Sequence, residues 1–143
     1  MANELDKRIV EFIAQHHVLS LATVIDNKPY TSNCFYVYLP DENAFLFTSD
    51  PETTHGGHMQ SNNNVGLNIF LETNAVGKIQ GLQITGKVKA LEGVEEKKAK
   101  ISYLKEYPFA VLKLETMWKV NPNFMKFTDN RLGFGKKLIW EEY

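Results

Sequence analysis

Short runs of apolar residues, many β-branched or alternating with polar ones, recur along most of the chain. Runs that favour strands cover residues 18–25, 30–39, 44–49, 65–70, 79–92, 117–120, 124–128 and 134–140. Polar turn residues at positions 26–29 and 40–43 separate the first three runs, which is typical of antiparallel hairpins. The pattern lacks the regular alternation of strands with helices that a doubly wound parallel sheet requires.

Two segments show helical periodicity instead. Residues 3–17 place Leu5, Ile9 and Phe12 on one face, so this segment is predicted to be an amphipathic helix. Residues 93–107 suit a charged helix that ends before Pro108, and the ambiguous residues 109–115 fit another helical turn. The pattern therefore predicts a mainly β fold: an antiparallel barrel of about six strands with an N-terminal helix and further short helices.

The predicted strand over residues 79–92 contains two glycines, Gly81 and Gly86. Gly86 interrupts a good alternation and predicts a bulge or a close approach of another backbone. Residues 81–87 nearly match the glycine-rich phosphate loop of nucleotide hydrolases, but Val88 occupies the required Ser/Thr position and the middle alternates as a strand. Residues 133–137 likewise lack the third glycine of a dinucleotide fingerprint. Neither segment predicts a nucleotide site. Lys136 and Lys137 of the second segment could bind an anion.

Composition narrows the class of protein. The 143 residues suit one domain, residues 1–143, with 43% hydrophobic and 23% charged residues. The net charge of −1 argues against nucleic acid and anionic membrane as partners. The single cysteine, Cys34, excludes an internal disulfide framework. The start shows no signal-peptide pattern and no apolar run is long enough to span a bilayer, so a cytoplasmic location is expected.

The stretch from residue 44 to residue 70 carries the most suggestive chemistry. A buried-type strand is followed by a hydroxyl-rich turn and a short segment with two histidines, His55 and His58. Such a turn at a helix start can hold a phosphate, because hydroxyls and free N–H groups supply donors and a histidine adds positive charge. On these residues alone, an ordinary polar connection capped by Thr53 or Thr54 is the preferred interpretation.

Other reactive side chains do not form a catalytic set. The spacing of His55 and His58 places both on one helical face, but no second cysteine or HExxH pattern completes a zinc site, so no metal is predicted. Cys34 in a strand is expected to be a small buried hydrophobe. No Ser–His–Asp or paired-carboxylate arrangement stands out. If the protein is an enzyme, a cofactor is expected to carry the reaction.

The elements, taken in order, resemble the flavin-binding split barrel of the pyridoxamine 5′-phosphate oxidase-like superfamily, with details most similar to its YhbP-type branch. The matching segments are residues 33–36, the strand end and turn at 47–55, residues 81–86 and, most specifically, residues 126–140. The resemblance covers nearly the whole chain and implies a split antiparallel barrel.

The resemblance also implies a cofactor, FMN, in a groove between the two subunits of a homodimer. A barrel of about six strands is filled by its own side chains, which agrees with a cofactor outside it. Thr48 and Ser49 would bind the phosphate, with His55 where oxidases of this type offer Arg or Lys. The flavin ring or ribityl chain would meet a second set of residues: Asn33, Cys34, Phe35 and either Gln80 or Gln83. Lys136 or Lys137 is the alternative phosphate partner.

The implied function is a flavin-dependent oxidoreductase of unknown substrate. Oxidation of pyridoxamine phosphate is not expected, because the substrate-phosphate arginines of the oxidases are missing and the only arginines are Arg8 and Arg131. One alternative is a non-catalytic protein that holds a flavin, or a haem through one of four histidines, for sensing or sequestration. Another is a fold whose groove has decayed and which serves as an interaction module.

Overall fold

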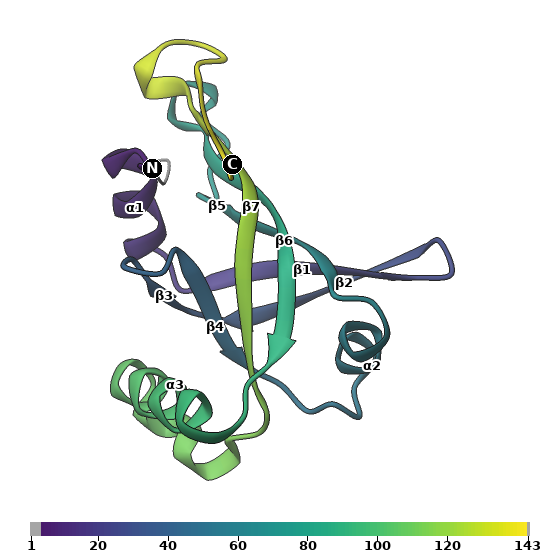
Figure 1. The fold of residues 1–143 in the computed structure, drawn as a ribbon. Coiled ribbons are helices and arrows are strands. Elements are labelled where there is room, and N and C mark those ends of the chain that lie inside the picture. The colour runs from purple at the N-terminus through teal and green to yellow at the C-terminus, as the bar shows by residue number, and fades with distance from the viewer. Residues whose placement is uncertain (1–3, 143) are drawn as a thin grey trace.

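The computed structural model describes residues 4–142 as one curled antiparallel sheet with helices at its ends and on its outside (Figure 1). The strands are β1 (Val18–Ile25), β2 (Lys28–Phe35), β3 (Val37–Leu39), β4 (Ala44–Thr48), β5 (Asn64–Phe70), β6 (Gln80–Ala90), β7 (Met117–Asp129) and β8 (Lys137–Glu141). The α-helices are α1 (Lys7–Ala14), α2 (Thr54–Ser61) and α3 (Gly93–Glu106). Short 3₁₀ helices are η1 (Val76–Lys78), η2 (Pro108–Lys113) and η3 (Asn130–Leu132). The predicted mainly β split barrel is confirmed, with eight strands rather than about six.

The order of strands across the sheet is β2-β1-β5-β6-β7-β4-β3. The first half of β7 pairs with β4 and its second half pairs with β8, so both strands flank the same side of β7. The chain itself closes the barrel, because the segment predicted as one strand over residues 30–39 breaks at Tyr36. Residues before this corner pair with β1 and residues after it pair with β4, at the other edge of the sheet.

Several predicted boundaries were wrong for identifiable reasons. The two short strands at residues 117–120 and 124–128 are one continuous strand, because Pro122 lies at a bulge and needs no N–H there. The last strand begins at Lys137 rather than at residue 134, since Gly133 and Gly135 have positive φ and form a turn. The first helix is shorter than predicted; it begins after its N-cap Asp6, and Asn3 lies outside the described residues. The helical turn expected near residues 109–115 is confirmed as η2.

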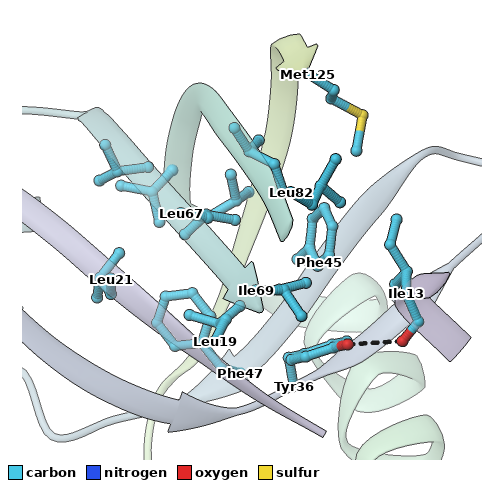
Figure 2. Packing of buried hydrophobic residues seen from close by; sticks show 14 of the residues in the cluster. Ile13, Leu19, Leu21, Tyr36, Phe45, Phe47, Leu67, Ile69, Leu82 and Met125 are labelled. Carbon is cyan, nitrogen blue, oxygen red and sulfur yellow. Dashed lines mark hydrogen bonds between the residues drawn. The ribbon is translucent and has the colours of Figure 1, made fainter. Parts of the chain in front are cut away.

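Apolar side chains from the sheet strands fill the barrel (Figure 2), with β2, β3 and β8 contributing only partly buried residues. α1 covers one end, where Ile9, Phe12 and Ile13 are at most 2% exposed. The rings of Phe12 and Phe127 lie 4.9 Å apart, which fixes the helix against β7. Along the strands, alternate residues therefore point into this core and away from it.

A second, smaller cluster packs α3 and η2 on the outside of the barrel. Leu46, Leu91, Ala99, Tyr103, Tyr107 and Met117 form it. Lys119 lies beside this cluster with its side chain 8% exposed, and its ammonium group pairs with Glu42 and Glu95. The pairing supplies the opposite charge that a nearly buried ammonium group requires.

The predicted irregularity at Gly86 is confirmed, because the register between β6 and β7 shifts between Thr85 and Gly86. A Cβ atom at Gly86 would lie 2.6 Å from the carbonyl oxygen of Asn121, a backbone atom that cannot easily move. We expect Gly86→Ala to lower the free energy of unfolding by about 1–3 kcal/mol, the cost of forcing extra atoms into a packed site. Urea unfolding measures this.

Gly57→Ala is the matched control, since a Cβ atom at this position in α2 meets no atom within 4 Å. The control should leave stability unchanged or raise it by up to about 1 kcal/mol, because alanine favours a helix. Equal stabilities of the two variants would contradict the proposed clash.

Candidate functional site

The turn between β4 and α2 is held by local hydrogen bonds. The Asp50 side chain accepts from the N–H of Glu52 at 2.8 Å, and the Thr53 hydroxyl donates to the Asp50 carbonyl at 2.7 Å. Thr53 also caps α2, since its hydroxyl oxygen accepts from the N–H of Gly56 at 3.1 Å. Only glycine fits at position 56, because an added Cβ atom would overlap the Asp50 carbonyl oxygen. The turn is thus packed tightly onto the first turn of the helix.

Ser49 and His55 meet at this helix start. A hydrogen bond joins Ser49 Oγ to His55 Nε2, and Thr53 Oγ1 lies 3.4 Å from the same nitrogen. The N–H groups of Thr54 and His55, the first two of α2, have no acceptor within the helix. A hydroxyl, an imidazole and two free N–H groups therefore gather at the positive end of a helix, which suits an anion.

Thr48 has a different role from its neighbour Ser49. Its hydroxyl donates to the carbonyl of Thr116 at 3.1 Å and accepts from the N–H of Glu115 at 3.0 Å. Both bonds tie the end of β4 to the segment before β7. Ser49 is therefore the better placed of the two predicted phosphate ligands.

The imidazole of His55 favours its neutral form. Burial, with a smaller contribution from the nearby His58 ring, lowers the pKa of His55 below its ordinary value of 6.5. His58 points elsewhere: its Nδ1 lies 3.0 Å from the hydroxyl of Thr23, and its ring packs edge-on against Tyr30. The two histidines share a helix face, as predicted, but serve different contacts.

The second part of the candidate site is the outer face, the sheet surface turned away from the barrel core. One cross-strand row on it consists of Asn33, Ser20, Asn68, Gln83 and Lys126, contributed in turn by β2, β1, β5, β6 and β7. We call these five residues the polar row. Ser20 donates to the side-chain oxygen of Asn33 at 3.0 Å.

Two adjoining hollows lie along the polar row and share Ser20 and Asn68. The first, of about 330 Å³, is lined by small residues such as Ala22 and Gly66. The second, of about 380 Å³, extends to Phe70 and to His16, His17 and Glu72. Because the side chains in the middle of the outer face are small, they leave space beside the amide groups of the polar row.

Strand alternation divides the predicted ring-binding residues between the two faces. Asn33 and Phe35 lie on the outer face, whereas Cys34 lies inward against the core, where burial raises the pKa of its thiol to about 11. Gln83 lies outward in the polar row, whereas Gln80 is 9% exposed on the inner face near α1. Cys34 and Asn33 therefore lie on opposite faces of the sheet, and Gln83 rather than Gln80 shares the outer face with Asn33.

Lys136 lies far from the turn that ends β4. Thr48 pairs with the first residue of β7, whereas Lys136 follows the far end of that strand. Figure 1 shows α2 and the β7–β8 connection at opposite ends of the molecule. A strand of this length spans roughly 40 Å. Within one chain, Lys136 and His55 therefore cannot contact the same phosphate.

Sequence reasoning missed Ser20, Asn68 and Lys126. Each lies between two buried residues of its strand, so alternation alone could have placed them on the face opposite the core. The alignment of five strands into one row could not be found in this way, since it depends on the registers of β1, β5, β6 and β7.

Comparison with known proteins fits this architecture. Residues 5–128 match the pyridoxamine 5′-phosphate oxidase family. The chain belongs to this family. It is 38% identical over 140 residues to a UPF0306 protein of Photorhabdus laumondii, with 98% of each chain covered. It is 30% identical over 132 residues to the UPF0306 protein YhbP of Escherichia coli O157:H7, covering 92% of this chain and 90% of the relative. The YhbP-type branch inferred from residue patterns is thus confirmed.

Solved structures at low identity share the fold. A haem-binding protein from Mycobacterium smegmatis superposes with a TM-score of 0.78 at 17% identity over 91% of this chain, which spans 55% of that protein. A FAD-binding protein from Mesorhizobium loti gives 0.71 at 12% identity, with 89% of this chain and 96% of that one covered. The family match ends at residue 128, so the segment 129–142 and β8 lie beyond it. No helix among residues 4–142 is long and apolar enough to cross a membrane.

The lowered pKa of His55 leads to a prediction about stability. The unfolded chain binds the histidine proton more readily than the folded protein does, so stability should be lost as the pH falls below about 6.5. In His55→Asn this part of the loss should disappear. Thermal unfolding midpoints between about pH 5 and pH 8 measure the difference. Identical acid slopes for the wild type and the variant would contradict a depressed pKa.

Proposed function

We propose that this protein is a homodimeric, cytoplasmic FMN-binding protein and acts as a flavin-dependent oxidoreductase. The observation that carries the proposal is the Ser49–His55 hydrogen bond at the start of α2, beside two free N–H groups. These groups fit a phosphate ester, although a histidine stands where an Arg or Lys would be the stronger cation. FMN, when bound, supplies hydride chemistry that none of the side chains at this site provides.

The outer face supplies the second half of the proposed site. Asn33, Asn68 and Gln83 carry amides that both donate and accept hydrogen bonds, as the polar edge of a flavin ring requires. The hollows beside them leave space for a planar ring. One chain leaves this face open, so a second copy is needed to exclude water from it.

Binding of FMN should depend on the protonation of His55. A phosphate dianion favours the imidazolium, whereas the ligand-free protein disfavours it, so binding takes up a proton. FMN should therefore bind more tightly than riboflavin, and its affinity should fall as the pH rises through the bound-state pKa of His55. His55→Ala should weaken FMN binding by about 1.5–3 kcal/mol. Fluorescence-quenching titrations between about pH 5.5 and pH 8.5 measure these affinities.

Two variants and a second ligand test whether the pH dependence of FMN binding comes from His55. His55→Lys should restore the affinity and remove its pH dependence, because the lysine stays charged. His58→Ala is the control, since its ring contacts Thr23 rather than Ser49. Riboflavin, run beside FMN, separates the histidine proton from that of the phosphate itself. The assignment is wrong if His55→Ala binds FMN like the wild type throughout this range; Lys136 or Lys137 of a second subunit would then be tested.

Exposed apolar side chains on the outer face lead to the prediction of a dimer. Val18, Phe35, Phe70 and Ile139 are 46–61% exposed, which is unusual for a face without a partner. Light scattering at micromolar concentration should show twice the chain mass of 16.4 kDa. Phe70→Lys should shift the protein to the monomer, while Val94→Lys, which changes an exposed residue of α3, should not. A wild type that is only monomeric would exclude the dimer.

Haem is the second candidate ligand. His17 is exposed in the hollow beside Asn68, and a free imidazole is a common iron ligand. One structural relative, from Mycobacterium smegmatis, is a haem-binding protein, which supports the same possibility. The absorbance spectrum of the purified protein distinguishes the candidates: flavin bands support the proposal, a Soret band supports haem, and neither band favours a fold that serves only as an interaction module.

A further inference from the structure

Lys126 differs from the other lysines in the described part of the chain. Among residues 4–142 the buried or half-buried lysines are Lys100, Lys119 and Lys126, and the first two form ion pairs with glutamates. No carboxylate among residues 4–142 pairs with Lys126. Lys126 therefore offers an ammonium group, a compact point charge, that no carboxylate of the described chain occupies.

The fold points Lys126 at the outer face. Its strand neighbours Met125 and Phe127 are buried in the core, so the lysine side chain leaves the sheet on the opposite side. On that side its cross-strand neighbours are Gln83 on β6 and Ile139 on β8. Lys126 is therefore the charged end of the polar row.

The surroundings of Lys126 favour an organic acid over a free phosphate. Phe124, two residues away on the same face, lines the hollow that also contains Gln83, and Ile139 is 61% exposed. Apolar groups on either side of a cation suit a carboxylate attached to an aromatic or branched body. A phosphate dianion usually gathers several donors, and Lys126 supplies a single point charge.

We propose that Lys126, with Gln83 beside it, binds the carboxylate of a small apolar organic acid on the outer face. The inference rests on the proposed function to the extent that this acid is the substrate of the flavin. Gln83 can donate a second hydrogen bond to the carboxylate, and the hollow of about 330 Å³ receives the apolar body. The substrate class would then be an aromatic or branched carboxylic acid.

Benzoate and its neutral counterpart benzamide test the site. Calorimetric titration of the purified protein, with and without FMN and at fixed ionic strength, should show benzoate binding at least about tenfold more tightly than benzamide. Lys126→Met should abolish this preference and Lys126→Arg should keep it. Lys97→Met removes the same charge from an exposed position on α3 and should also keep it. A merely structural role of Lys126 would change both affinities without changing their ratio.

Three results would overturn the proposal. One is a wild type that does not prefer benzoate, and another is a preference that survives in Lys126→Met. The third is inorganic phosphate that competes as strongly as benzoate at Lys126, which would assign the site to phosphate. If the wild type shows no preference while Lys126→Met dissociates the dimer, Lys126 instead pairs with an acidic residue of the second subunit. Because the titration is also run without FMN, a protein that binds no flavin would disprove the proposed function and still report on this site.

Discussion

The structure depends on the corner at Tyr36, where the chain leaves one edge of the sheet and joins the other. A corner interrupts the ladder, and its backbone groups must find other partners. Side-chain hydroxyls provide them: Tyr107 donates to the Tyr36 carbonyl at 2.6 Å, and Tyr103 donates to the Phe35 carbonyl at 3.2 Å. The Tyr36 hydroxyl donates to the Ile13 carbonyl at 2.6 Å (Figure 2). Three tyrosines thus fasten α1 and α3 to the point that closes the barrel.

Closure of the barrel at this corner explains why the candidate site lies outside it. The interior is filled by side chains such as Phe45, Phe47 and Trp118, each at most 2% exposed. A ligand must therefore use the surface, and the surface offers two polar regions, the start of α2 and the outer face. Burial raises the pKa of Tyr107 to about 12, with a further contribution from Glu106, so this hydroxyl stays a donor. The corner that shapes both regions is thus insensitive to ordinary changes of pH.

His55 and Lys126 represent two ways of placing a charge at a site. The imidazole is held neutral by burial and becomes a strong partner only when an anion draws a proton onto it. The lysine lacks a carboxylate partner in the described part of its own chain. The first region would make anion binding depend on pH through His55, whereas the second places an ammonium group beside the amide of Gln83.

The sequence by itself indicated most strand positions, the turn chemistry, the bulge at Gly86 and the family, because alternation, turn residues and local motifs act over a few neighbouring positions. It also indicated Ser49 and His55, which lie six residues apart. Only the tertiary structure decided that Cys34 and Gln80 face the core, that Lys136 lies at the far end of β7, and that Lys126 completes a row of five strands. Those facts depend on the registers between distant strands and on a corner that no local pattern encodes, since one residue of slip exchanges the two faces of a strand.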